Sequence, residues 1–306
     1  MKKIGIVILH FRSVSVTKDC LDSLCSIKLP NDSQVQIVVV DNASEEPFPK
    51  NTPRCSLGEV VVLTNTKNLG FTGGMNTGMR FLLDNGTDYL IILNNDTILD
   101  RDLLIKLIEQ ADSDPKVGGV VPKIYFYKGT EFHKDRYKEK DLGHVIWYAG
   151  GETDWSNVFG FHVGVDEVDT GQFAAAHEVG FATGCCLLLK REVLELVGLL
   201  DDKYFLYYED NDMSQRIKRE GFRIMFEPKA ILWHKNAKSA GGAGSVLQDY
   251  YISRNRLLFG MRYAPLRSKI ALIRESFRQL FSGRPWQKRG IMDFYLQRFG
   301  RGSYKI

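Results

Sequence analysis

Four short runs of branched apolar residues most constrain how this chain of 306 residues can fold. These apolar runs are residues 4–9, 35–40, 59–64 and 89–93. Segments whose apolar residues have helical spacing lie between most of them. Strands that are apolar throughout are buried on both faces, and their alternation with helices is typical of parallel sheets. The pattern therefore predicts the α/β class, with a mainly parallel sheet flanked by helices.

The composition indicates a globular chain, with 44% hydrophobic residues and without an apolar segment of the ~20 residues needed to cross a bilayer. The first apolar run is followed by His10 and Arg12 and has no cleavage site, so we expect a first strand and not a signal peptide. The five cysteines show no Cys-x-x-Cys pair and no metal-ligand spacing. They predict reduced thiols in the cytoplasm and argue against zinc or disulfide frameworks.

The basic charge is concentrated in the tail. Residues 262–306 carry eleven Lys or Arg against two acidic residues, a net of +9, so residues 1–261 carry −5. A solvated surface and a nucleic-acid patch are the plain interpretations, but no recognisable nucleic-acid motif accompanies this charge. Interleaved apolar residues, among them Phe277, Phe281 and Trp286, favour a helical extension that contacts an anionic membrane surface.

Polar residues end two of the predicted strands. Asp41 follows the second run, and the fourth run ends in Asn94-Asn95-Asp96. The carboxyl ends of parallel strands collect ligands, and hard oxygen ligands suit Mg²⁺ or Mn²⁺, which in turn bind phosphates. Each of these residues also suits an ordinary turn or helix cap.

A loop rich in glycine leads from the third run into a helix. It contains Asn68, Gly70 and Asn76, and its glycines allow close backbone approach to a ligand, while a helix amino end favours phosphate oxygens. It does not match Gly-x-Gly-x-x-Gly, which disfavours a dinucleotide dehydrogenase.

Three carboxylates follow the aromatic run 204–208. Glu209, Asp210 and Asp212 stand close enough in sequence for one pKa to be raised, which suits a general base, although acids also favour a helix start. We expect the helix-start role for Asp212. His234 ends an apolar strand, where a histidine is either a satisfied core group or a metal ligand.

Taken in order, these motifs resemble family 2 glycosyltransferases of the GT-A fold, in particular their rhamnosyltransferase-like branch. The resemblance covers about residues 1–260 and rests on Asp41, the Asn68 loop, Asn94-Asn95-Asp96, Thr183-Gly184, Glu209-Asp210 and His234. It implies an inverting enzyme that moves rhamnose or another hexose from a nucleotide diphosphate sugar to a surface glycan or a lipid-linked acceptor. Polysaccharide, cell wall or O-antigen biosynthesis is the expected setting.

The resemblance also implies a role for each matching residue. Asp210 would be the base, with Glu209 beside it, and Asp96 with His234 would hold the divalent metal. Asn94 replaces the first acid of the Asp-x-Asp motif, so the metal should bind weakly, because an amide oxygen is the weaker ligand.

The donor would be dTDP-rhamnose or a UDP-sugar, bound by Asp41, Asn68, Gly70, Asn76, Asn94 and Asn95. Arg254 would contact the donor diphosphate, and an exposed arginine on an amphipathic helix is the alternative. Thr183 and Gly184 would lie near the acceptor hydroxyl.

The expected organisation is a catalytic domain over residues 1–260, with a nucleotide-binding half at 1–122 and an acceptor-binding half at 123–260, and a basic extension at 261–306. The expected location is the cytoplasm, peripherally at the inner face of the cell membrane. Two other functions remain open: a catalytically idle domain that binds sugar nucleotides, and a nucleotidyltransferase. A binder would not need the Glu209-Asp210 pair, and a nucleotidyltransferase should show a glycine-rich, basic first loop, whereas residues 4–10 contain one glycine.

Overall fold

The structure is a computed structural model that describes residues 1–50, 55–236 and 244–305. Its first part alternates strands and helices: β1 (Lys2–His10), α1 (Val14–Leu24), β2 (Ser33–Asp41), β3 (Val60–Thr64), α2 (Gly70–Asp84), β4 (Tyr89–Asn94), β5 (Thr97–Leu99), α3 (Leu103–Asp112) and β6 (Val117–Phe126). Its second part contains β7 (Ile146–Tyr148), β8 (Gly151–Asp154), β9 (Phe159–His162), β10 (His177–Glu178), β11 (Cys186–Lys190), α4 (Arg191–Val197), α5 (Glu209–Arg219), β12 (Arg223–His234), α6 (Val246–Tyr263), α7 (Leu266–Ser282) and α8 (Pro285–Tyr295).

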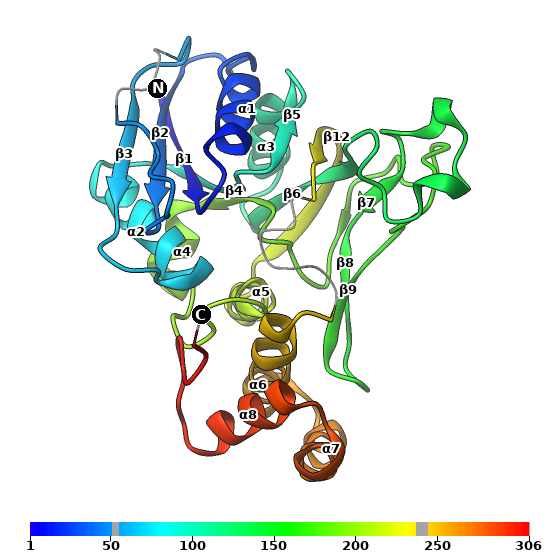
Figure 1. Cartoon of the computed structure of the whole chain (residues 1–306). Helices are drawn as coiled ribbons and strands as arrows, with labels where there is room; N and C mark the ends of the chain where they lie inside the picture. The colour runs from blue at the N-terminus through cyan, green and yellow to red at the C-terminus, as the bar shows by residue number, and fades with distance from the viewer. Residues whose placement is uncertain (51–54, 237–243, 306) are drawn as a thin grey trace.

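One ten-stranded sheet forms the centre, in the order β10-β12-β6-β11-β4-β1-β2-β3, with β5 on β12 and β7 on β6. β1 pairs in parallel with β2 and β4, and β12 pairs in parallel with β6, whereas β11 runs antiparallel between β4 and β6. The predicted mainly parallel sheet is confirmed for β1, β2, β3, β4, β6 and β12, while β11 inside the sheet and the short strands β5, β7 and β10 run antiparallel to their neighbours. Figure 1 shows this sheet at the centre of the first part of the fold.

Helices cover both faces of this sheet (Figure 1). Leu24 of α1 and Leu107 of α3 pack with Ile6 and Leu93 on one face. α2 packs on the other face at Gly78, where an added Cβ would lie 2.5 Å from a methyl of Val7. A larger residue at Gly78 would therefore push α2 away from the strands that carry the site.

β12 ends at His234, as the sequence predicted, and contains an irregularity in its pairing. It is a single strand of 12 residues whose pairing with β6 shifts between Glu227 and Ile231. Pro228 lies in this irregular stretch, where the missing N–H of a proline breaks no regular ladder. The strand therefore continues past the bulge and delivers His234 to the same edge as the end of β4.

A disulfide joins Cys25 to Cys55, so the prediction that all five cysteines remain thiols is wrong for this pair. Cys25 caps the carboxyl end of α1, and Cys55 precedes β3. The fold brings their Cα atoms to 5.1 Å, within the range that a disulfide spans. Their separation of 30 residues hid this proximity in the sequence, while Cys20, Cys185 and Cys186 are buried thiols as expected.

The basic tail forms α7 and α8, which fold back against α6 (Figure 1). Gly290 of α8 lies so close to α6 that an added Cβ would stand 2.3 Å from the Tyr250 carbonyl oxygen. Trp286, predicted to enter a membrane, instead packs its ring against Tyr250 and Tyr304, with centroid distances of 6.1 and 5.0 Å. Within the described residues, none of the helices is both long and apolar enough to span a membrane.

Candidate active site

The candidate site forms where the parallel strands end. In the sheet register His10 of β1 lies opposite Asp41 of β2, and Leu9 lies opposite Asn94 of β4. The Asn94 N–H donates to the Cys185 carbonyl at 2.8 Å, which brings the Thr183-Gly184 segment beside the end of β4. The fold thus gathers residues from three separate motifs at one edge: Asp41, Asn94 and Thr183-Gly184.

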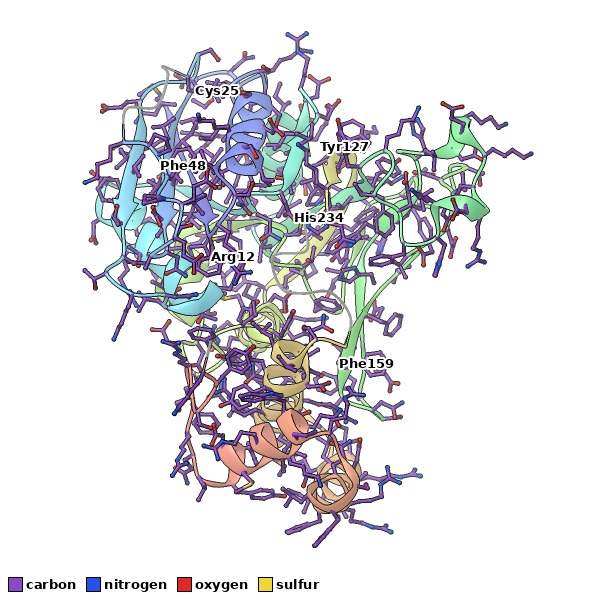
Figure 2. All side chains as sticks on the ribbon, in the orientation of Figure 1. Arg12, Cys25, Phe48, Tyr127, Phe159 and His234 are labelled. Carbon is purple, nitrogen blue, oxygen red and sulfur yellow. A yellow bond between two sulfur atoms is a disulfide. The ribbon has the colours of Figure 1, made fainter. Side chains whose placement is uncertain are left out.

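Asp96 and His234 form a buried pair at this edge. His234 stands opposite Thr97 in the β5–β12 pairing, and its Nε2 lies 3.1 Å from Asp96 Oδ1. The two residues are only 7% and 6% exposed, and His234 Nδ1 is buried without a hydrogen-bond partner in the described parts of the chain. Figure 2 shows His234 near the centre of the molecule. A carboxylate beside an imidazole whose Nδ1 has no hydrogen-bond partner among the described residues fits a divalent cation.

The described residues contain no cluster of three His, Cys, Asp or Glu side chains that could hold a metal. Asp96 and His234 would therefore supply two ligands at most from this residue set, beside the half-buried Asn94 amide. A cation held in this way needs further oxygens from another molecule, and diphosphate oxygens suit Mg²⁺ or Mn²⁺.

The ring of Trp147 contacts the rings of His234 and His162 edge-on, with centroid distances of 4.5 and 4.4 Å. Burial lowers the pKa of His162 to about 4, against the weaker opposing effect of its hydrogen bond to the Trp147 carbonyl. His162 is therefore neutral at physiological pH and adds no charge beside the metal pair.

Asp210 lies at the start of α5 with both carboxylate oxygens held in place. Oδ2 accepts the Gly184 N–H at 3.1 Å, and Oδ1 accepts the backbone and side-chain N–H groups of Asn211 at 2.8 and 3.0 Å. Burial raises the pKa of Asp210 above its ordinary value, although these N–H donors oppose the shift. A desolvated, oriented carboxylate with a raised pKa is suited to accept a proton.

Glu209 precedes Asp210 and is buried more deeply. Burial first, and then the charge of Asp210, raise its pKa well above the ordinary value. Its Oε2 is buried without a hydrogen-bond partner among the described residues. Of the two neighbouring carboxyls, Glu209 thus has the more strongly raised pKa, and Asp210 is the one that ionises first as pH rises.

Asp212 does not join the pair. Its carboxylate accepts from the Tyr204 and Tyr263 hydroxyls and from Arg216 and Arg262. This network agrees with the structural role that the sequence suggested for Asp212.

The loop before α5 is strained and clamped from α6. Phe205, Tyr207 and Tyr208 all have positive φ, at 65°, 68° and 72°, where bulky residues are uncommon. Asn255 Nδ2 lies within 2.9 Å of the carbonyl oxygens of Tyr204, Leu206 and Tyr207.

Arg254 is part of this clamp and is not the diphosphate ligand that the sequence suggested. Its side chain is fully buried, and its Nη atoms donate to the carbonyl oxygens of Lys203, Tyr204, Arg298 and Gly300. All but one of its N–H directions point at backbone carbonyls, and Nε donates to Asn255 Oδ1. The guanidinium therefore joins the loop before α5 to residues 298–300.

The residues predicted to bind the donor divide into two groups. Asp41 accepts the N–H groups of Ser44 and Phe48, both at 2.9 Å, and so shapes the loop that follows β2. Asn68 Oδ1 accepts from Asn42 and from the Gly70 N–H. Gly70 has φ +75° and lies against the Phe205 carbonyl, where a Cβ would stand at 2.4 Å. These residues lie beside the strand ends, and their contact with a donor stays a prediction.

Asn76 and Asn95 point elsewhere. Asn76 is 1% exposed, and its amide exchanges hydrogen bonds with the backbone of Leu200 and donates to Asp202, so the donor-binding prediction is wrong for this residue. Asn95 Nδ2 donates to Thr17 of α1 at 2.9 Å. Both amides hold elements of the scaffold together.

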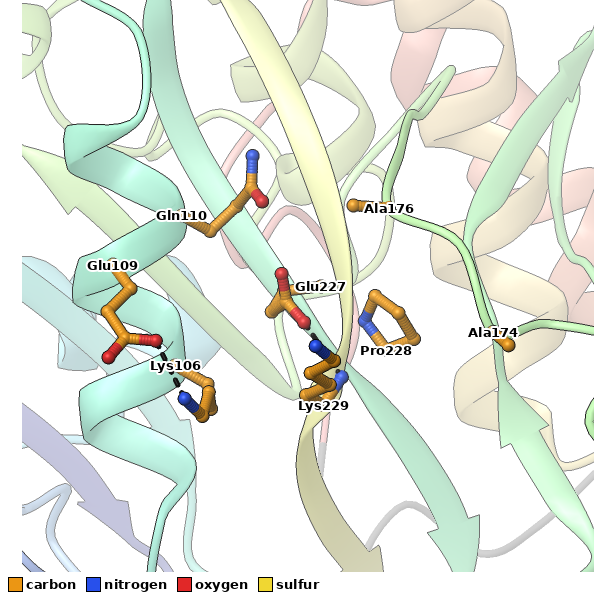
Figure 3. A pocket seen from close by; sticks show the side chains of 8 residues that line it. All are labelled: Lys106, Glu109, Gln110, Ala174, Ala176, Glu227, Pro228 and Lys229. Atoms are coloured by element: carbon orange, nitrogen blue, oxygen red, sulfur yellow. Dashed lines mark hydrogen bonds and ion pairs between the residues drawn. The ribbon is translucent and has the colours of Figure 1, made fainter.

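A cavity of about 330 Å³ lies outside this site (Figure 3). It is lined by α3, by the β12 bulge and by Ala174 and Ala176, with none of the predicted site residues. Lys106 pairs with Glu109 at 2.7 Å, and Glu227 accepts the backbone N–H of Lys229. This cavity therefore does not compete with the strand-end site.

Comparison with known proteins decides the family. The family model described as "Glycosyltransferase like family 2" matches residues 2–256. The chain belongs to this family. The predicted enzyme class, glycosyltransferase, is confirmed.

Curated relatives of this glycosyltransferase include two named rhamnosyltransferases. The N-acetylglucosaminyl-diphospho-decaprenol L-rhamnosyltransferase of Mycobacterium tuberculosis is 23% identical over 230 residues, covering 71% of this chain and 72% of the relative. The dTDP-rhamnosyl transferase RfbF of Shigella flexneri is 24% identical over 243 residues, covering 75% of this chain and 72% of the relative. The predicted likeness to the rhamnosyltransferase branch is confirmed.

Solved structures confirm the GT-A fold. The mannosyltransferase PcManGT from Pyrobaculum calidifontis, in complex with GDP-Man and Mn²⁺, matches with a TM-score of 0.53 and 19% identity over 99% of this chain and 76% of that chain. GalNAc-T7 with UDP, GalNAc and Mn²⁺ matches with a TM-score of 0.60 and 16% identity, over 94% of this chain and 58% of that chain. Both neighbours contain a divalent metal with a nucleotide.

Sequence reasoning missed three residues that shape the site. Asn255 and Trp147 gave no signal, because their partners lie far away along the chain. Asn211 follows the predicted base directly, and its amide could have been considered as a local partner.

Proposed function

We propose that the chain transfers a sugar, rhamnose or another hexose, from a nucleotide diphosphate sugar to a hydroxyl of a growing surface glycan or a lipid-linked acceptor, with inversion at the anomeric carbon. The observation that supports this most is Asp210, a desolvated carboxylate held between Gly184 and Asn211. A domain that only binds sugar nucleotides would not need a carboxylate with a raised pKa at this place.

In the proposed reaction, Asp210 takes the proton of the acceptor hydroxyl while that oxygen attacks the anomeric carbon. A new carbon–oxygen bond forms as the bond to the diphosphate breaks, and the nucleotide diphosphate leaves with the electron pair. Asp210 acts as base because its oxygens are fixed by three N–H donors. The backbone N–H of Gly184 also ties Asp210 to Thr183, the predicted acceptor side.

Asp96 and His234 are the residues that would hold Mg²⁺ or Mn²⁺, and Asn94 and Asp41 stand at the ends of the two strands that flank β1, where they would meet the donor. When bound, the cation would neutralise the charge that develops on the departing diphosphate. Both structural neighbours contain Mn²⁺ with a nucleotide, which supports this proposal.

The donor is proposed as dTDP-rhamnose, because two relatives are rhamnosyltransferases, or as a UDP-sugar, because the GalNAc-T7 structure contains UDP. A polyprenyl-linked acceptor, as in the name of the mycobacterial relative, would require the enzyme to work from the cytoplasm at the inner face of the membrane.

A donor panel tests this proposal. We expect one nucleotide diphosphate sugar, with Mn²⁺, to raise the thermal midpoint, and its free nucleotide diphosphate to be released when an acceptor hydroxyl is supplied. Stabilisation without release for every acceptor would favour the idle binding domain. Binding of nucleoside triphosphates in place of sugar nucleotides would favour a nucleotidyltransferase and contradict the proposal.

A further inference from the structure

One face of α7 is apolar and exposed. Leu266, Ile270, Phe277 and Phe281 are 73, 54, 52 and 83% exposed. At 3.6 residues per turn these four side chains fall within about 60° of arc around the helix. Single exposed apolar residues are normal on a protein surface, but four in one stripe along one helix form an exposed apolar strip.

The opposite face of α7 is the one that packs against the protein. Ser268, Leu272 and Ser276 are buried, and Leu272 packs in a cluster with Val158 and Phe259. The exposed strip is therefore not the side that holds the helix in place. Changes in the strip should leave the fold intact.

Arginines border the strip. Arg267, Arg274 and Arg278 are exposed and follow the apolar residues around the helix, on the adjoining roughly 40° of arc. Along the whole of Leu266–Ser282, all of it described, the single acid is Glu275, which lies on the inner side with its two oxygens bound to Arg256 at 3.0 Å. The outer face of α7 thus carries apolar and cationic side chains without an anion.

The apolar strip continues onto α8. The rings of Phe277 and Tyr295 lie 5.6 Å apart, and Tyr295, Leu296 and Met292 are 39, 54 and 45% exposed. The two helices thus present one surface, which we name the α7 face: Leu266, Ile270, Phe277, Phe281, Met292, Tyr295 and Leu296 with Arg267, Arg274 and Arg278.

We propose that the α7 face docks on an anionic lipid surface, with α7 lying in the plane of the headgroups. Apolar side chains beside arginines, on a helix too polar to cross a bilayer, suit the boundary between headgroups and acyl chains. The charge distribution supports a lipid surface over a protein partner, because residues 262–306 carry +9 while residues 1–261 carry −5. This docking would bring the candidate site to a lipid-linked acceptor. The docking proposal does not depend on the proposed sugar transfer.

The test is sedimentation of the full chain with vesicles of phosphatidylcholine alone or mixed with phosphatidylglycerol, without donor or acceptor. We expect binding to the anionic vesicles only, weakening as salt rises, because the Debye length shortens. Arg267→Gln/Arg274→Gln/Arg278→Gln should lower the partition coefficient about a hundredfold, since each cation near the surface contributes roughly fivefold. Phe277→Ser/Phe281→Ser should lower it at least about tenfold.

Two matched controls make the result specific. Lys134→Gln/Arg136→Gln/Lys138→Gln removes the same charge from an exposed loop, and Leu196→Ser/Phe132→Ser removes side chains that are 64 and 56% exposed elsewhere. Both should bind vesicles like the wild type, and all variants should keep the wild-type thermal midpoint. Equal losses in variants and controls, or no binding to anionic vesicles, would overturn the proposal. So would a concentration-dependent dimer that the α7 variants abolish, because the face would then be a protein interface.

Discussion

At the scale of single residues, two neighbouring carboxyls at the start of α5 have different tasks because their surroundings differ. Asp210 accepts three N–H donors, whereas Glu209 has a buried oxygen without a partner in the described structure. Hydrogen bonds to the ionised form lower a carboxyl pKa, and desolvation raises it. Glu209 therefore keeps its proton to higher pH than Asp210 does.

Glu209→Gln should change how stability depends on pH. The folded pKa of Glu209 is raised, so the wild type loses stability as pH rises from the unfolded value of about 4.3 through the folded pKa. The amide does not titrate, so the unfolding free energy of the variant should rise relative to that of the wild type as pH increases over this window. Urea unfolding at a series of pH values measures this. The exposed Glu192→Gln is the control, and a gap that does not change with pH would disprove the effect.

His234→Ala should lower the affinity of the protein for Mn²⁺ without unfolding it. His234 supplies one of the two assigned metal ligands, so we expect the Mn²⁺ concentration for half-maximal turnover to rise about tenfold or more. Removing the ring also leaves Asp96 without its 3.1 Å neighbour. The exposed His133→Ala should behave like the wild type. Turnover that persists after exhaustive chelation would remove the metal from the mechanism.

At the scale of elements, the strands of the first half were predictable and those of residues 123–180 were not. β1, β2, β3 and β4 are apolar runs that read as strands without knowledge of their partners. The later strands are short: β7 has three residues and pairs with β6, β10 has two and pairs with β12, and β8 pairs with β9 in a separate two-stranded sheet. Strands whose stability comes from distant partners leave little local pattern.

The candidate site follows the same rule. Asp96, Asp210 and His234 follow or begin recognisable elements, so the sequence indicated them, and the fold brings each to the strand-end edge. Arg254 was assigned to the donor because its partners, the carbonyl oxygens of Arg298 and Gly300, come more than forty residues later. A buried arginine that satisfies carbonyls and an exposed one that binds phosphate look alike in sequence.

Arg254→Lys should destabilise the protein and also reduce turnover. A lysine has three donors on one atom and cannot reach the four carbonyl oxygens that the guanidinium bonds, so we expect a loss of about 2–4 kcal/mol. Arg256→Lys, two residues along α6, changes a partly exposed pair with Glu275 and one hydrogen bond to the Asn157 carbonyl oxygen, and should cost less than about 1 kcal/mol. Chemical unfolding compares the two. Equal effects would mean that Arg254 does not clamp the loop.

At the scale of the whole molecule, the end of the chain supports the site. Arg254 links residues 298–300 to the loop before α5, and Asp293 of α8 accepts from Ser303 and Tyr250. The division proposed from the sequence, at residue 260, falls inside α6 (Val246–Tyr263). We keep a catalytic part and a basic tail as the proposed organisation, but the two share a helix and one buried guanidinium.

Deleting residues 298–306 should therefore lower both stability and turnover. The deletion removes two carbonyl partners of Arg254 and the Ser303 donor of Asp293, and it leaves buried charges with fewer partners. We expect a loss of at least about 3 kcal/mol in unfolding free energy. The thermal midpoint and the turnover of the deleted protein measure this. An unchanged midpoint would show that the chain end is dispensable.

The central claim, that Asp210 is the base of sugar transfer, is tested most directly by the turnover of Asp210→Asn with a donor that stabilises the wild type. The amide cannot take the acceptor proton, so turnover should fall by about 10²–10⁴ while donor affinity and thermal midpoint stay close to those of the wild type. Asp114→Asn, the same change at a residue that pairs with Arg223 outside the site, is the control and should keep wild-type turnover. Wild-type turnover in Asp210→Asn would contradict the account.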